Sequence, residues 1–204
     1  MKKNNHKGLF IAFDGPNGVG KSTLIQHTRN ALIENGIKVW TTKEPTNTPL
    51  GEFTRQIAET LGNESLTCLV AADRYQHLNC EILPLLEKEQ VVITDRYILS
   101  SLILQRMDDV DVDLILSINS GIVLPDIQIV VKADQDIIQS RLNNREQLTR
   151  FELGQRTSEE LFYLKEGVEI LKNLGVEIIE IENSGDIYPN ISYIVEYIRK
   201  AVER

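Results

Sequence analysis

The sequence DGPNGVGKST at residues 14–23 directly follows the short apolar run LFIAF at residues 9–13. Four of its positions fit the pattern G-x-x-x-x-G-K-[ST]: Gly15, Gly20, Lys21 and Ser22. The apolar run is typical of a buried strand, and a helical pattern starts at Lys21 and stops at Gly36. A glycine-rich loop between a strand and a helix predicts a phosphate-binding loop (P-loop), in which backbone N–H groups point at phosphate oxygens.

The polar side chains of this P-loop predict contacts with ATP and Mg²⁺. Lys21 would reach the β- and γ-phosphates, and the hydroxyl of Ser22 would ligate the metal ion. The rest of the loop and the first turn of the helix would hold the donor nucleotide: Gly15, Pro16, Asn17, Gly18, Val19, Gly20 and Thr23.

The chain alternates between apolar runs and helical patterns. Strands are expected at 9–13, 37–41, 90–94, 127–131 and 176–181. Helices are expected at 21–36, 49–62, 65–88 with a bend near Pro84, 98–106, 110–121, 134–145, 158–173 and 187–202. This alternation predicts a single α/β domain over residues 1–204, with a five-stranded parallel sheet covered on both faces. Ligands of such sheets bind at the carboxyl ends of the strands, where the P-loop begins.

A second motif, VVITDRYILSS at residues 91–101, also stands at the end of an expected strand. Asp95 would emerge at the same edge as the P-loop, where its carboxylate could hold Mg²⁺ directly or through water. Arg96 follows at once, and its guanidinium suits a phosphate dianion. The alternative is a surface ion pair between these two side chains.

An arginine-rich segment, RLNNREQLTRFE at residues 141–152, has no helical apolar face after about residue 145. It contains Arg141, Arg145 and Arg150. One interpretation is a lid over about 145–157 that closes positive charge onto a transferring phosphoryl group. A solvated basic loop is an equal alternative.

Composition limits the partners. The net charge of −8 and the pI of about 5.0 argue against nucleic acid, because phosphate backbones are bound by an excess of Lys and Arg. The apolar run near the N-terminus is too short for a signal peptide or a membrane span. Cys68 and Cys80 lie in a helical pattern without zinc spacing, so we expect buried free thiols in the cytoplasm. His6, His27 and His77 show no ligand spacing and are expected on surfaces or helix faces.

Several segments occur in the order seen in thymidylate kinases. Besides the P-loop they are KEPT (43–46), LVAADRYQH (69–77), DRYILSS (95–101), LPD (124–126) and TRFE (149–152). The chain therefore resembles this family over nearly its whole length. The resemblance implies a P-loop kinase fold of three α/β/α layers with an arginine-containing lid. It also implies a homodimer that transfers the γ-phosphoryl group of ATP to thymidine monophosphate with Mg²⁺.

On the donor side the resemblance carries over intact. Lys21, Ser22 and Asp95 match the family pattern. Gly18 within the P-loop, together with Arg145, resembles those members that place catalytic arginines in the lid. Arg150 matches the lid arginine near the adenine.

On the acceptor side the resemblance is mixed. Arg96 matches the arginine that binds the acceptor phosphate, Arg74 the one that contacts the thymine ring, and Gln105 a glutamine of the same pocket. The implied pocket also contains Asn17, Lys43, Glu44, Val70, Tyr97 and Ser101. Four positions depart from the family, since an acid, an arginine, a phenylalanine and a tyrosine are replaced by Asn17, Lys43, Val70 and Leu104.

These departures concern the side that selects the acceptor. Val70 and Arg74 are four residues apart on a helix, so they share the face that would line the base pocket. Valine cannot stack on a base as phenylalanine does, and such a stack is worth ~1–3 kcal/mol. The base, the sugar and a modified nucleotide as the acceptor therefore stay open.

Two other functions fit the same motifs. A deoxynucleoside kinase would use Glu44 as the base that a sugar hydroxyl requires. A catalytically silent nucleotide-binding relative would keep the P-loop without transfer. A monophosphate is mostly a dianion at neutral pH and needs cations instead of a base. The clustering of Lys21, Arg74 and Arg96 at expected site edges in an acidic chain favours a nucleoside monophosphate as the acceptor.

Overall fold

The computed structural model describes residues 1–143 and 157–203. Arg145, Arg150 and most of the expected lid at 145–157 lie outside the described residues. All five expected strands are present: β1 (Phe10–Asp14), β2 (Val39–Lys43), β3 (Val91–Asp95), β4 (Ile127–Lys132) and β5 (Glu177–Glu182). Each is shifted by only one or two residues from its expected range.

The strands form one parallel sheet in the order β2-β3-β1-β4-β5. β1 and β4 are buried along almost their entire length, because helices cover both faces of the sheet. The register pairs Phe13 with Asp95 and Lys43 with Asp95. The carboxyl ends of β1, β2 and β3 therefore meet at one edge, which brings the P-loop and the DRY motif together.

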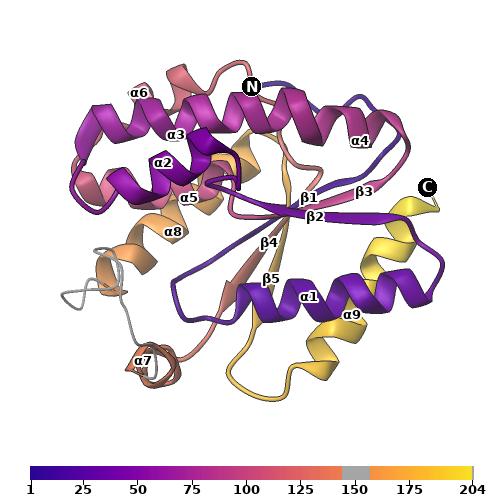
Figure 1. Ribbon diagram of the computed structural model, residues 1–204. Coiled ribbons are helices and arrows are strands. Elements are labelled where there is room, and N and C mark those ends of the chain that lie inside the picture. The colour runs from indigo at the N-terminus through magenta and orange to yellow at the C-terminus, as the bar shows by residue number, and fades with distance from the viewer. Residues whose placement is uncertain (144–156, 204) are drawn as a thin grey trace.

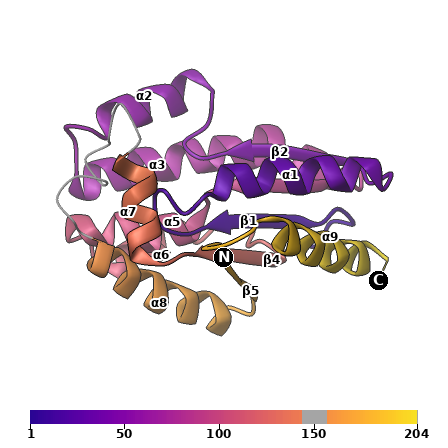
Figure 2. The ribbon, with the colours of Figure 1, turned by 90° about the horizontal axis from the view of Figure 1, so that it is seen from below.

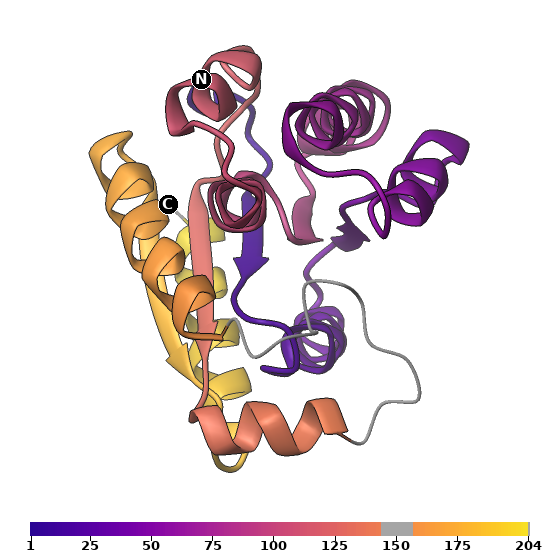
Figure 3. The same cartoon turned by 90° about the vertical axis from the view of Figure 1, so that its left-hand side faces the viewer.

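Helices cover the two faces of the sheet unequally (Figures 1 and 3). On one face lie α1 (Lys21–Glu34) and α9 (Tyr188–Val202), which pack against each other. The other face carries α3 (Asn63–His77), α4 (Leu83–Glu87), α5 (Ile98–Leu104) and α8 (Thr157–Asn173). The described residues also form α2 (Pro49–Ile57), α6 (Val112–Ile118), α7 (Gln135–Asn143) and a 3-10 turn (Arg106–Asp108). Figure 2 shows α2 standing apart from the sheet, beyond β2 and α3.

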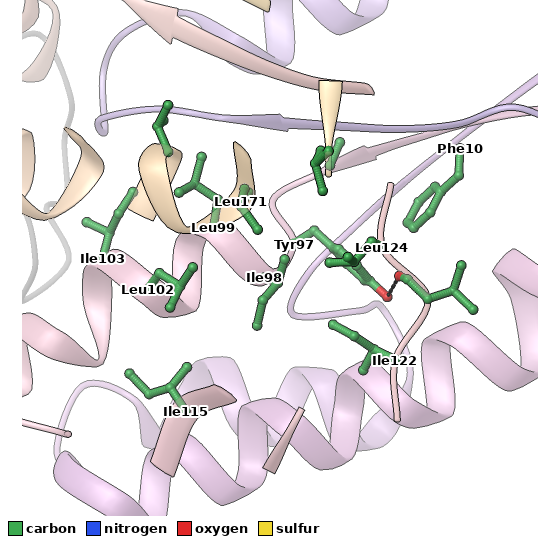
Figure 4. Packing of buried hydrophobic residues seen from close by; sticks show 14 of the residues in the cluster. Phe10, Tyr97, Ile98, Leu99, Leu102, Ile103, Ile115, Ile122, Leu124 and Leu171 are labelled. Carbon is green, nitrogen blue, oxygen red and sulfur yellow. Dashed lines mark hydrogen bonds between the residues drawn. The ribbon is translucent and has the colours of Figure 1, made fainter. Parts of the chain in front are cut away.

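Two apolar clusters, one on each face, form the core. In the cluster beneath α5 and α8, the ring of Tyr97 packs edge-on against the ring of Phe10, with 5.0 Å between the ring centroids (Figure 4). The Tyr97 hydroxyl donates a hydrogen bond of 2.9 Å to the carbonyl of Val123. The side chain of Tyr97 is thus a core element that anchors the start of α5.

The expected long helix at 65–88 is interrupted before Pro84. α3 passes through a π-helical turn (Leu78–Ile82) into α4. The wider turn lets the N–H of Leu83 donate to the carbonyl of Leu78 while Pro84, which has no N–H, enters α4. The helical winding therefore changes just before Pro84, whereas the bend expected there stays a prediction.

One expectation about burial is wrong. Cys68 and Cys80 are both exposed free thiols, because they lie on the solvent side of the α3–α4 helix. His77, expected on a surface or a helix face, lies on α3 with its side chain buried beneath the acceptor side of the site. In the described ranges, no helix is both long enough and apolar enough to cross a bilayer.

Candidate active site

The P-loop has the backbone that its glycines predict. Gly15 has φ of +151°, and a Cβ there would lie 2.1 Å from the carbonyl oxygen of Val131 on β4. Gly20 has φ of +97° and leads directly into α1. Both conformations favour glycine, and together they fold the loop between β1 and α1 so that it surrounds the N-terminus of that helix.

Lys21 lies buried within the loop. Its Nζ donates to the carbonyls of Gly15 at 2.7 Å and Pro16 at 2.8 Å. Burial, followed by the positive charge of Arg96, lowers the pKa of Lys21 to about 7. An ammonium in this position is short of negative charge, which the oxygens of a polyphosphate would supply.

Ser22 and Asp95 stand side by side where α1 begins and β3 ends. The Ser22 hydroxyl donates to the carboxylate of Asp95 at 2.6 Å, so the two motifs meet at one edge of the sheet, as predicted. A hydroxyl and a carboxylate are oxygen ligands of the kind that Mg²⁺ prefers, and the ion usually retains several waters. The pair therefore fits the proposed metal, although the described residues contain no cluster of three or more His, Cys, Asp or Glu for a metal.

Arg141 of the arginine-rich segment supports the P-loop. From α7 it donates to the carbonyls of Val19 at 2.8 Å and Asn183 at 3.1 Å. Asn183, after β5, donates to the same Val19 carbonyl at 2.8 Å. The tip of the P-loop is thus held from two sides, and within the described residues Arg141 makes backbone contacts instead of facing solvent.

A cavity of about 410 Å³ extends from the P-loop toward α2 and α3. Most residues expected in the site line it: Asn17, Gly18, Gly20, Lys21, Ser22, Thr23, Lys43, Glu44, Val70, Arg74, Asp95, Arg96, Tyr97, Ser101, Leu104 and Gln105. Gly15, Pro16 and Val19 do not line it, since they form the inner side of the loop. The cavity therefore joins the donor and acceptor motifs in one space.

Arg96 reaches into this cavity from a left-handed backbone, with φ of +74°. A non-glycine residue in that region costs about 1–3 kcal/mol and is kept where its surroundings fix it. Its N–H donates to the carbonyl of Phe13 at 2.8 Å. Its guanidinium donates to Asn17 Oδ1 at 2.6 Å and to the hydroxyl of Ser100 at 3.1 Å. Asn17 therefore holds an arginine in place.

Arg74 is almost completely buried, and its guanidinium makes four hydrogen bonds. Its partners are Glu44 Oε2 at 2.8 Å, Asn119 Oδ1 at 2.9 Å, Ser101 Oγ at 2.9 Å and the Tyr97 carbonyl at 3.1 Å. The guanidinium also lies 5.2 Å from the centre of the Tyr97 ring. An arginine has five N–H groups, and its partners in the described part of the chain leave one of them for a ligand.

Both oxygens of Glu44 have protein partners. Oε2 accepts from Arg74, and Oε1 lies 3.1 Å from Nδ1 of His77. Nε2 of His77 is in turn 2.8 Å from the hydroxyl of Thr42. A general base needs an oxygen within reach of the proton that it removes, whereas this carboxylate binds a buried arginine and a buried histidine.

Several apolar side chains line the end of the cavity near α2 and α3. Leu66 and Val70 of α3 and Leu104 of α5 line it, with the exposed side chain of Arg55 contributed by α2. Val70 and Arg74 lie on one face of α3, as their spacing predicts. Lys43 is exposed at the rim. Of Tyr97, whose ring belongs to the core, the carbonyl faces Arg74.

Three residues of the site do not follow from the motifs. Asp14 and Ser100 belong to quoted motifs but show no signal beyond an acid before the first glycine and a serine after DRY. His77 contacts Glu44 from 33 positions away. Since both side chains sit at ends of elements that the fold brings together, only the packed structure identifies the contact.

Comparisons with known proteins identify the family and the fold. A family model described as thymidylate kinase matches residues 13–184. A probable thymidylate kinase of Caldivirga maquilingensis is 40% identical over 148 residues, which cover 71% of this chain and 72% of the relative. A probable thymidylate kinase of Thermococcus gammatolerans is 32% identical over 205 residues, which cover 93% of this chain and 96% of the relative. The solved thymidylate kinase of Candida albicans superposes with a TM-score of 0.76 over 97% of this chain and 94% of its own, at 20% identity, and shows the same fold.

Proposed function

The chain belongs to the thymidylate kinase family, and from this premise we propose that it transfers the γ-phosphoryl group of ATP to a nucleoside monophosphate. The acceptor is thymidylate or a related pyrimidine nucleotide, and the products are ADP and the nucleoside diphosphate. The reaction is a step of nucleotide biosynthesis. The homodimer that the resemblance implies and the cytoplasmic location inferred from the cysteines both stay predictions.

The chain's own residues divide the work at the two ends of the cavity. The P-loop amides and Lys21 bind the donor phosphates, and Lys21 leaves the carbonyls of its own loop to do so. Ser22 and Asp95 would hold Mg²⁺, which supplies charge neutralisation at the β- and γ-phosphates. Arg145 and Arg150, outside the described residues, are proposed from the sequence alone to act on the transferring group and near the adenine.

The acceptor needs cations and no base. Arg96 binds the acceptor phosphate, whose oxygen forms a bond to the γ-phosphorus while the bond from phosphorus to the β–γ bridging oxygen breaks. A phosphate dianion gives up no proton in this step, so no residue has to accept one. The roles of the other acceptor-side residues, including Lys43 and Gln105, are proposed from the resemblance and from their place in the cavity.

One observation carries the choice of acceptor: Glu44 has both carboxylate oxygens bound to buried partners, while Arg96 projects into the cavity. A deoxynucleoside kinase would need the opposite, a free carboxylate facing the sugar hydroxyl.

Two variants test this choice, Glu44→Gln and Arg96→Ala, each assayed for ADP release with thymidylate and with thymidine. The proposal expects Arg96→Ala to lose most activity on thymidylate, and Glu44→Gln to keep it within about tenfold per folded molecule, since loss of a base costs ~10²–10⁴-fold. Arg199→Ala, a surface arginine on α9, is the matched control. Loss in Glu44→Gln, activity retained in Arg96→Ala and preference for thymidine would together favour the deoxynucleoside kinase.

A further inference from the structure

A buried carboxylate lies behind Arg96, and the reaction described above does not use it. Asp14 is the last residue of β1 and is 0% exposed. Its Oδ1 accepts a short hydrogen bond from the hydroxyl of Ser100, and its Oδ2 accepts one of 3.1 Å from Nε2 of Gln128. Burying a carboxylate costs free energy, so an acid at this point of the core requires a compensating role.

Ser100 connects this carboxylate to the acceptor side of the cavity. A serine hydroxyl has one proton, and that of Ser100 is directed at Asp14. The lone pairs are then available to Arg96, whose Nη1 donates to Ser100 Oγ at 3.1 Å. The charge of Asp14 thus sets the direction of the hydroxyl, and the hydroxyl sets one of the two contacts that orient the guanidinium.

We propose that Asp14 is a positioning residue for the acceptor phosphate, because it holds Arg96 in its binding orientation through Ser100. The inference rests on the proposed function, since it takes Arg96 as the phosphate ligand. Asp14 itself touches no substrate. It lies near enough to attract both Lys21 and Arg96, so one buried negative charge serves the cations of the donor and acceptor ends.

Asp14→Asn is a sharp test because the neighbourhood fixes how asparagine must sit. Nε2 of Gln128 also donates to the carbonyls of Ala12 at 3.0 Å and Ile129 at 3.3 Å, which prevents its amide from turning over. The asparagine must then offer its oxygen to Gln128 and its NH₂ to Ser100. The hydrogen bond between residue 14 and Ser100 is then reversed. The Ser100 hydroxyl accepts from the asparagine, its own proton has no acceptor there, and its lone pairs are shared between the asparagine and Arg96.

The experiment measures the dissociation constants of thymidylate and thymidine by calorimetry. The proteins are the wild type, Asp14→Asn, Ser100→Ala and the double variant. Each single variant should raise the dissociation constant of thymidylate by about tenfold, which is the size of a lost hydrogen bond to a charged group, and should leave the dissociation constant of thymidine unchanged. The double variant should be no weaker than either single variant by more than about twofold, because both changes break the same chain.

Asp126→Asn is the matched control, since Asp126 is another aspartate that accepts two hydrogen bonds, from the N–H of Phe10 and the amide of Asn4, but lies at the opposite end of the strands. It should leave the ratio of the two dissociation constants unchanged. Equal weakening of thymidylate and thymidine, no weakening, or additive effects in the double variant would overturn the inference. Ser100→Ala decides alone if Asp14→Asn does not fold. A wild type that binds thymidine as tightly as thymidylate would overturn the proposed function itself.

Discussion

Nε of Arg74 donates to Oε2 of Glu44 at 2.8 Å, and both side chains are almost completely buried. His77 occupies the other oxygen of the same carboxylate. The pair gives the glutamate that follows β2 a structural role, which does not need it to act as a base. It keeps the guanidinium of Arg74 fixed at the wall of the cavity, where the resemblance places the acceptor base.

Glu44→Gln should therefore destabilise the protein. A buried arginine that loses its charge partner costs ~3 kcal/mol or more in the free energy of unfolding, which urea denaturation at pH 7 measures. Glu180→Gln is the control, because Glu180 pairs with Lys132 at the surface and such pairs are worth ~0–1 kcal/mol. Equal losses in the two variants would show that Glu44 is not needed to neutralise Arg74.

Lys21→Ala should abolish phosphoryl transfer and keep the fold. Within the described part of the chain, Nζ of Lys21 donates to two carbonyls, and its burial as a cation is unfavourable, so the thermal midpoint should not fall. Single-turnover ADP formation and a thermal melt measure both effects. Turnover near that of the wild type would refute the assignment of the donor site.

The free energy of unfolding of the Asp14→Asn variant should increase relative to that of the wild type as the pH rises. Burial raises the pKa of Asp14 to about 6 from the ordinary 3.8, so the folded wild type binds the proton more tightly than the unfolded chain. The contribution of protonated Asp14 to the free energy of unfolding of the wild type is therefore complete below pH 3.8. As the pH rises through 6, roughly 3 kcal/mol of this contribution is lost.

Urea unfolding of both proteins between pH 4 and pH 7.5 measures this difference, because titrations common to the two proteins cancel. A difference that stays flat over the range would contradict the raised pKa. A gain in stability at pH 7.5 together with weaker thymidylate binding would be the behaviour of a residue retained for function at the expense of stability.

Val70→Phe should tighten thymidylate binding. Val70 lines the end of the cavity near α2 and α3, on the same face as Arg74, and a ring there could stack on the base for ~1–3 kcal/mol. Val70→Leu is the control, since it adds apolar volume without a ring. If calorimetry gives the two variants equal affinities for thymidylate, Val70 does not face the base.

The sequence predicted the sheet, the P-loop and the DRY motif because these depend on local patterns. Apolar runs define β1, β3 and β4, and glycine spacing defines the loop. The strand register then places Ser22 Oγ at 2.6 Å from Asp95 Oδ2, because both motifs stand at the same edge of the sheet. Burial of individual polar residues was not predictable in this way.

The connections of Asp14 and His77 show why. Asp14 and Ser100 are 86 positions apart, and His77 and Glu44 are 33 apart. Each contact depends on the turn that follows a strand and on the packing of a helix against it. The absence of zinc spacing likewise favoured buried thiols at Cys68 and Cys80, but cysteine spacing does not report which face of a helix meets solvent, and both thiols are exposed.

The central claim is that the acceptor is a nucleoside monophosphate. The most direct test is a coupled ADP-release assay of the wild type with ATP and Mg²⁺ against every ribo- and deoxyribonucleoside monophosphate and against thymidine. The account predicts turnover with thymidylate or another pyrimidine monophosphate and none with thymidine. Turnover with thymidine that exceeds turnover with every monophosphate would contradict it.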